Sequence, residues 1–341
     1  MLVFYLFVLL ISIYGSGFRK DSTNGEALSI EQCNAIKGIS ILLVFISHAS
    51  QYVSASGYQF SMPGDDVFLI IKSSIGQLCV VMFFFYSGYG IQWSIKKKGK
   101  LYVKDMLKRR ILTTLVNFDI AVVFFVITNL LLGNEMPLKR VLMSLFAWDS
   151  TGNSEWYIFD ILSLYAITYI SSLMTSNNRI RFCLLLSMTL ILIYVLYLLK
   201  GSWWYNTIFS YPAGVFMAMN KERLIGLVKK YFWPILFGLI ALFLFLWVFR
   251  KSNHMIYSTA SVAFAFGIVA LTTRIRIQNR YLIWLGMNLF PVYIYQRLPM
   301  LTLNELCPSL VSVYPIAFYL ISFLITIIIA ASYRFWRLSF R

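Results

Sequence analysis

The sequence predicts an all-α, polytopic membrane helix bundle with about ten core transmembrane helices plus one N-terminal helix. Of its 341 residues, 60% are hydrophobic and 13% are charged, and the mean hydropathy is +0.74. Soluble domains are about half apolar and about a quarter charged. Long apolar runs recur along the chain, without the apolar–polar alternation of barrel strands. The composition excludes a disordered chain, a small disulfide scaffold and an ordinary cytosolic enzyme.

Apolar runs that suit a membrane-crossing helix are separated by polar or charged loops, and each run is interpreted as one span. One of them, 203–219, contains polar residues and Pro212, which weakens the helical pattern. In chain order, the predicted spans are 1–17, 36–54, 67–94, 111–132, 156–174, 182–199, 203–219, 231–249, 256–273, 281–300 and 314–335.

The first span differs from a cleaved signal peptide in its flanking charges. No basic residue precedes it, whereas Arg19 and Lys20 follow it, which is typical of a retained anchor with its amino terminus outside. We therefore expect an anchor helix and cytoplasmic linker at 1–27, a membrane domain at 28–336 and a cytoplasmic tail at 337–341.

The formal charge of +17 arises from 30 Lys and Arg against 13 Asp and Glu, and its placement predicts an orientation. Alternate loops, including the carboxyl terminus, carry 22 of the basic residues, whereas the opposite loops carry six. Cytoplasmic loops are enriched in Lys and Arg. We expect a multi-pass protein of the cell membrane, surrounded by lipid bilayer, with a cytoplasmic C-terminus and no nucleic-acid partner. The opposite loops hold Lys139, Arg140, Lys200, Arg250, Lys251 and Arg297.

The four cysteines do not form a disulfide framework or a metal-binding motif. Two of them, Cys79 and Cys183, lie in predicted spans, and Cys33 and Cys307 are expected on opposite sides of the membrane. No metal site is therefore expected.

Ionisable residues inside spans are costly and usually functional, which directs attention to His48. It ends an almost wholly apolar run, and Lys37 precedes it by eleven residues. Eleven residues are about three helical turns, so both side chains lie on one face, about 16 Å apart along the axis. A packing histidine and a catalytic or proton-conducting histidine both fit this pattern.

Two further segments offer groups near the cytoplasmic side. The run Phe83–Gly90 contains Tyr86 and Ser87, beside glycines that allow close approach of a ligand or of another helix. Arg109 and Arg110 open the next span at a depth close to that of Lys37. Two guanidinium groups and an ammonium group at one mouth suit phosphate binding, although positive-inside charge explains part of the pattern.

Polar residues at the outer ends of two later spans are candidates for substrate binding. Asp160 lies about 7 Å into its span, close to Trp156, where it could share a cavity with His48. Tyr293 and Gln296, near the end of the 281–300 span, offer hydrogen-bonding groups for a sugar or headgroup, although an interfacial belt explains them equally well.

Together these segments resemble the integral membrane acyltransferase-3 family. The resemblance covers about residues 28–336 and depends on the order of several short motifs. These are a basic residue separated by ten residues from a histidine (Lys37 and His48), a Phe-rich helix ending in Ser-Gly (Phe83 to Gly90), the pair Arg109-Arg110, the Trp-Tyr span at Trp156, and a late Leu-Gly helix from Leu285 to Gln296.

The resemblance implies a ten-helix core, with residues 1–17 as an added helix, and an acyltransferase activity, commonly O-acetylation of surface polysaccharides. It also implies acyl-CoA, commonly acetyl-CoA, as a co-substrate from the cytoplasm, a glycan as acceptor, and no permanently bound cofactor. The family's histidine corresponds to His48, as general base or acyl carrier, and its basic partner corresponds to Lys37. Many members have Arg there, so Lys37 supplies the charge without the two-pronged guanidinium.

Two other classes of function fit the spans and the buried His48. A transporter or exporter of a polysaccharide intermediate would explain the span number, but less well the aligned Lys37 and His48. A structural partner in a glycan-export assembly would need neither residue. Acyl-CoA turnover with release of free CoA distinguishes the acyltransferase from both.

Overall fold

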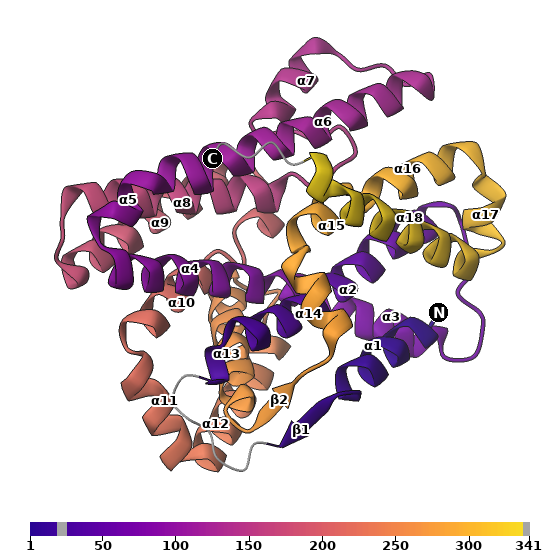
Figure 1. The fold of residues 1–341 in the computed structure, drawn as a ribbon. Coiled ribbons are helices and arrows are strands. Elements are labelled where there is room, and N and C mark those ends of the chain that lie inside the picture. Colours follow the sequence, from indigo (N-terminus) through magenta and orange to yellow (C-terminus); the bar gives the residue numbers. More distant parts are fainter. Residues whose placement is uncertain (19–25, 337–341) are drawn as a thin grey trace.

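A computed structural model describes residues 1–18 and 26–336 as a bundle of helices with two short strands, β1 (Ser16–Phe18) and β2 (Ile275–Ile277) (Figure 1). The strands pair antiparallel. The helices of this part of the chain are α1 (Val3–Ile13), α2 (Ile30–Ala55), α3 (Asp65–Ile75), α4 (Leu78–Lys98), α5 (Lys100–Met106), α6 (Thr113–Leu131), α7 (Leu138–Leu145), α8 (Trp156–Met174), α9 (Asn178–Leu199), α10 (Ser210–Met219), α11 (Lys221–Lys230), α12 (Phe232–Val248), α13 (His254–Thr272), α14 (Arg280–Met287), α15 (Leu289–Tyr295), α16 (Arg297–Leu306), α17 (Pro308–Ser312) and α18 (Pro315–Trp336), with single turns η1 (Glu26–Leu28), η2 (Leu107–Leu112) and η3 (Ser202–Trp204).

The predicted fold class is confirmed, because long apolar helices dominate the structure. Within the described residues, seven helices are long and apolar enough to cross a membrane, and an eighth span results if the bent pair α11 and α12 is counted as one. These eight correspond to eight of the eleven predicted spans. The protein is therefore a multi-pass membrane protein. Arg19 and Lys20 and the tail at 337–341 lie outside the described residues.

The predicted span at 281–300 is instead three short helices, α14, α15 and α16. Proline inside a helix removes one backbone hydrogen bond and collides with the carbonyl four residues earlier. The breaks at Asn288 and Gln296 each lie three residues before a proline, Pro291 and Pro299. The two prolines therefore explain why a single straight span does not form.

The predicted spans at 1–17 and 203–219 are also shorter helices. Helix α1 ends before Gly15, whose φ of 78° turns the chain into β1, and the Asn279 side chain holds this turn by donating to the Ile11 and Tyr14 carbonyls. Helix α10 has ten residues, with Pro212 in its first turn, where proline is tolerated.

Two helix pairs at the centre pack backbone against backbone through glycines. A Cβ on Gly38 of α2 would strike the Leu282 carbonyl of α14, and one on Gly286 of α14 would strike the Asn34 carbonyl of α2. Helices α4 and α10 meet in the same way through Gly88 and Gly214. Small residues permit such close approach between membrane helices.

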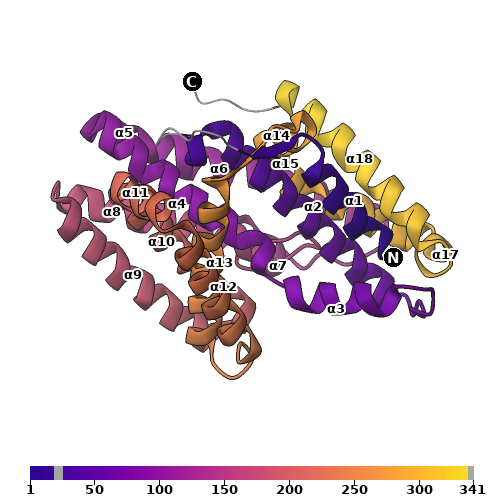
Figure 2. The ribbon, with the colours of Figure 1, turned by 90° about the horizontal axis from the view of Figure 1, so that it is seen from below.

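These pairs place α2 and α4 inside the bundle and α9 at its edge. About 72% of the apolar window of α2 is buried, against 17% for α9, which leaves α9 facing lipid. Helices α5 and α11 lie toward one side of the molecule, and α3, α17 and Met1 lie toward the other (Figures 1 and 2). We call these sides the basic end, which carries Lys96 to Lys98, Arg109 and Arg110, and the opposite end.

Candidate active site: two chambers that meet at Tyr293

A cavity of about 510 Å³ opens among α2, α4, α6, α8, α14 and α15 toward the basic end. We call it the basic chamber. Its polar lining comprises the residues Lys37, Ser87, Arg109, Arg110, Thr113, Thr114, Asn117, Tyr157, Tyr165, Asn288, Tyr293 and Tyr333. Three of these side chains are cationic and, among the described residues, no Asp or Glu lines the cavity. Its chemistry therefore suits an anionic ligand.

The three cations of the basic chamber have different surroundings. Lys37 is half-buried, and its ammonium group repels the nearby Arg110 guanidinium. Nε of Arg110 donates to the Tyr102 hydroxyl at 3.1 Å. Arg109 forms an exposed ion pair with Asp105 at 3.1 Å, in which the Arg109 side chain is 70% exposed. An anion between Lys37 and Arg110 would relieve their repulsion, whereas Arg109 already has a counter-charge.

The two arginines lie on a π turn, η2, that joins α5 to α6 into one continuous helix. The Thr113 N–H donates to the carbonyl of Lys108, five residues back, and the Thr113 hydroxyl donates to the same carbonyl at 2.8 Å. Such turns insert an extra residue into a helix and frequently occur at functional sites. The helix begins eleven residues before the predicted start at 111, and the π turn brings both arginines to one cavity.

A second cavity of about 250 Å³ contains His48, and we call it the His48 chamber. Its polar and aromatic lining is Ser47, His48, Gln51, Gln77, Trp156, Trp203 and Tyr293. The His48 ring is 9% exposed, whereas Gln51 and Trp203 are exposed at the opposite end of the molecule. The chamber therefore places the imidazole ring of His48 beneath a rim of amide and indole side chains.

The His48 ring is oriented by the loop before α8. Its Nε2 atom lies 3.5 Å from the Ser154 hydroxyl, and Nδ1 makes no hydrogen bond within the described part of the chain. The loop is held in place because Asn129 donates to the Thr151 carbonyl at 2.9 Å and Ser150 donates to the Asn153 carbonyl at 2.8 Å. One imidazole nitrogen therefore remains available for a proton from a substrate.

A charged cluster fixes the same loop at the opposite end. Nζ of Lys200 donates to the Trp148 carbonyl at 2.6 Å and lies 4.0 Å and 4.3 Å from the Trp148 and Trp204 ring centres. Burial lowers the pKa of Lys200, and the nearby carboxylates of Asp149 and Glu155 oppose this change. Burial raises the pKa of Glu155. The cluster anchors the Trp148–Glu155 segment beside the His48 chamber.

Tyr293 of α15 lines both chambers, and no other residue of either described lining does so. Its side chain is 2% exposed. The ring packs edge-on against Tyr157 at 5.1 Å and faces the His48 ring at 6.3 Å between centroids. The two cavities therefore lie end to end, with Tyr293 between them.

The structure brings seven of the predicted site residues to these two chambers: Lys37, His48, Ser87, Arg109, Arg110, Trp156 and Tyr293. The other three lie elsewhere. Tyr86 is buried near Cys33. Asp160 is fully buried near Tyr157 and Tyr293 but lines neither cavity. Gln296 is also fully buried, and its Nε2 donates to the Tyr293 carbonyl at 3.2 Å.

Several residues of the His48 chamber, and Ser154 beside His48, were not predicted from the sequence. Ser154, Gln51, Gln77 and Trp203 belong to loops or helix ends, where polar and aromatic residues are ordinary interfacial features. Gln51 could have been predicted from its spacing, because it lies three residues after His48 and therefore on the same helical face. Nothing in the sequence distinguished Ser154 from its polar neighbours.

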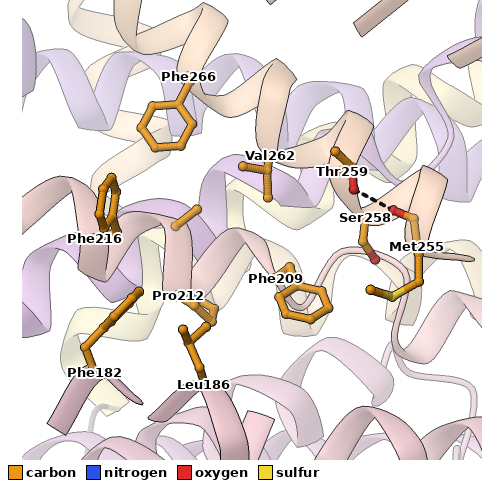
Figure 3. A pocket seen from close by; sticks show the side chains of 11 residues that line it. Phe182, Leu186, Phe209, Pro212, Phe216, Met255, Ser258, Thr259, Val262 and Phe266 are labelled. Atoms are coloured by element: carbon orange, nitrogen blue, oxygen red, sulfur yellow. Dashed lines mark hydrogen bonds between the residues drawn. The ribbon is translucent and has the colours of Figure 1, made fainter. Parts of the chain in front are cut away.

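The apolar groove among α9, α10 and α13, about 440 Å³, has a different chemistry. Figure 3 shows four phenylalanines around it, and its two hydroxyls come from Ser258 and Thr259. Ser258 donates to the Asn206 carbonyl and Thr259 to the Met255 carbonyl. No charged residue of the described chain lines this groove, so it lacks groups for phosphate binding or acid–base chemistry.

A family model described as an acyltransferase domain matches residues 30–334, about nine-tenths of the chain. No curated protein and no solved structure matches it.

Proposed function

Because the chain belongs to the acyltransferase-3 family, we propose that it transfers an acyl group, specifically acetyl, from cytoplasmic acyl-CoA to a hydroxyl of a cell-surface or exported glycan. One observation carries the proposal. A chamber with three cations and no described carboxylate adjoins a chamber that contains a buried histidine. This arrangement suits a phosphorylated donor on one side and a neutral hydroxyl acceptor on the other.

In this proposal the basic chamber binds the phosphates of acyl-CoA. Guanidinium groups bind phosphate through paired N–H donors, and an ammonium group acts as a point charge. Arg110 and Lys37, which repel each other, are both stabilised when a phosphate lies between them. The pantetheine arm then extends along α2 from Lys37 toward His48, a distance of about 16 Å. Ser87, on the wall of the same chamber, lies along this path.

The reaction transfers one acyl group and one proton. The acceptor hydroxyl oxygen forms a bond with the acyl carbon, and the carbon–sulfur bond to CoA breaks. His48 takes the hydroxyl proton and returns it to the CoA thiolate, so that the products are the glycan ester and free CoA. In the second route, His48 carries the acyl group briefly between donor and acceptor.

The His48 chamber is the proposed acceptor site. Flat indole rings of Trp156 and Trp203 can pack against the apolar face of a sugar, and the amides of Gln51 and Gln77 can hydrogen-bond its hydroxyls. Hydroxyl-binding sites that combine apolar walls with a few polar groups are typical of small-molecule pockets.

Removing the guanidinium groups of the basic chamber should weaken donor binding unequally. A charge-assisted hydrogen bond contributes about 1.5–3 kcal/mol, so Arg110→Ala should raise the Kd for acetyl-CoA by about tenfold or more. Arg109→Ala should have a smaller effect, because its exposed charge is paired with Asp105. Calorimetric titration of the purified protein measures both constants. Arg179→Ala, outside the chamber lining, is the matched control, and equal affinities for all variants would contradict the donor site.

The orientation is tested with the exposed native Cys307 between α16 and α17 at the opposite end. If the basic end is cytoplasmic, a membrane-impermeant maleimide should label Cys307 in intact cells or spheroplasts, and Cys307→Ser should abolish this label. Labelling that requires opened membranes would reverse the orientation, and with it the side from which the donor enters.

The activity itself is tested by incubating the purified protein with acetyl-CoA and glycan-containing membranes. Release of free CoA together with new glycan ester, detected by NMR, is the expected result. Glycan movement without CoA release would support the polysaccharide exporter instead.

A further inference from the structure

Tyr293 is the one residue that the described linings of the two chambers share. Tyr293 contributes to both linings, yet its side chain is 2% exposed, because the ring lies against Tyr157 on one side and faces His48 on the other. The cavities beyond it have about 510 Å³ and about 250 Å³. The Tyr293 ring therefore lies where the two cavities approach each other.

The position of Tyr293 is determined by several neighbours rather than by helix geometry alone. Helix α15 has seven residues between two breaks, and Gln296 at the second break donates to the Tyr293 carbonyl. The hydroxyl of Tyr293 lies near Ser154 but forms no hydrogen bond within the described residues, and the Ser154 hydroxyl also approaches Nε2 of His48. The ring is thus supported from α8, from the loop before α8 and from its own short helix, while it faces open space on two sides.

We propose that Tyr293 is a partition that positions the thioester and separates it from water at the opposite end until an acceptor hydroxyl lies beside His48. This proposal rests on the proposed acyl transfer. The physical reason is competition: water in the His48 chamber would take the acyl group through the same histidine, giving a free acid and CoA. Active sites commonly exclude water to suppress such hydrolysis. Rotation of the ring about its side-chain bond would join the chambers when both substrates are bound.

The partition predicts different effects for two substitutions. Tyr293→Phe keeps the ring and should leave the ratio of acetyl-CoA hydrolysis to glycan acylation near that of the wild type. Tyr293→Ala removes the ring and should raise this ratio severalfold, as measured by acceptor-independent CoA release against glycan ester. Tyr295→Ala is the matched control, since this buried tyrosine lies on the same short helix and lines neither chamber. An unchanged ratio in Tyr293→Ala would overturn the partition.

A second measurement tests the partition without any acyl-CoA and therefore separates it from the proposed function. Thr114→Cys, on the wall of the basic chamber, is introduced after the four native cysteines are replaced by serine. A small charged thiol reagent applied from the opposite end should label this position only when Tyr293→Ala or Tyr293→Leu is also present. Labelling from the basic end should be equal in all variants, which verifies folding. Labelling from the opposite end with Tyr293 intact would overturn the proposal, whatever the activity.

Discussion

Replacement of His48 by alanine should lower acyl transfer by about 10²- to 10⁴-fold, the usual contribution of a general base. No other titratable side chain lines the His48 chamber except Cys79 and Tyr293 among the described residues, so no carboxylate or second imidazole can take the proton. The protein level should be normal, because the variant removes one hydrogen bond of 3.5 Å to Ser154 and one ring contact with Tyr293 at 6.3 Å between centroids. Ester content of the surface glycan, measured by NMR, reports the effect in cells.

The chain provides its own control for this substitution. His254 is the second of two histidines, and it packs edge-on against Tyr197 and Tyr205 at 5.1 Å and 5.0 Å, outside both chambers. His254→Ala should retain acyl transfer. Normal glycan ester in cells that produce His48→Ala at the wild-type level would refute a catalytic role for His48.

The same experiment can separate the two roles proposed for His48. Purified protein is mixed with radiolabelled acetyl-CoA without acceptor and then denatured rapidly. Label retained on the wild-type protein and absent from His48→Ala would assign the acyl-carrier role. Absence of label from both proteins, with acylation intact in the wild type, would assign the general-base role.

Substitution of Gly286 by alanine should strongly destabilise the protein. The added Cβ would collide with the Asn34 backbone carbonyl, which cannot rotate away as a flexible side chain would. Overpacking typically costs about 1–3 kcal/mol, and a backbone collision lies at the upper end of this range. Helices α2 and α14 must separate, which also moves Lys37 relative to the chamber wall formed by Gly286 to Pro291.

The midpoint of thermal unfolding in detergent measures the loss of stability in Gly286→Ala. Gly38→Ala, which meets the Leu282 carbonyl from the other helix, should lower the midpoint similarly. Gly267→Ala in α13 is the matched control, because its Cβ would meet no atom within 4 Å. There the higher helix propensity of alanine, about 1 kcal/mol, should keep or raise the midpoint. Equal midpoints for Gly286→Ala and Gly267→Ala would show that α2 and α14 are not packed backbone to backbone.

The fold class could be predicted because the bilayer imposes a simple length requirement on apolar segments. Seven of the predicted spans match single or continuous helices, and the 231–249 span matches α12, which counts as a span only together with α11. The resemblance to the acyltransferase-3 family, drawn from short ordered motifs, is confirmed by the match over residues 30–334. The exceptions include the predicted span at 281–300, which is apolar and long enough to cross a membrane. There, Pro291 and Pro299 break the helix.

The candidate site was predictable only in part. His48 and Lys37 were visible because a charged or titratable group is rare inside an apolar span, and their spacing on one helix determines their relative placement. Asp160 satisfied the same rarity criterion but lines neither chamber, because its exposure depends on which helices surround α8. Ser154 and Trp203 were not identifiable, since polar loop residues are ordinary at membrane interfaces.

The sequence by itself determined that this chain crosses a membrane several times, which of its ends is basic, and that Lys37 and His48 share one face of one helix. These properties follow from local composition and from the 3.6-residue helical period. Only the tertiary structure decided that Arg110 faces Lys37, that Ser154 approaches His48, and that Tyr293 stands between two chambers. Such contacts join residues more than 70 positions apart, and they depend on the glycine-mediated packing of α2 on α14 and of α4 on α10, which periodicity does not encode.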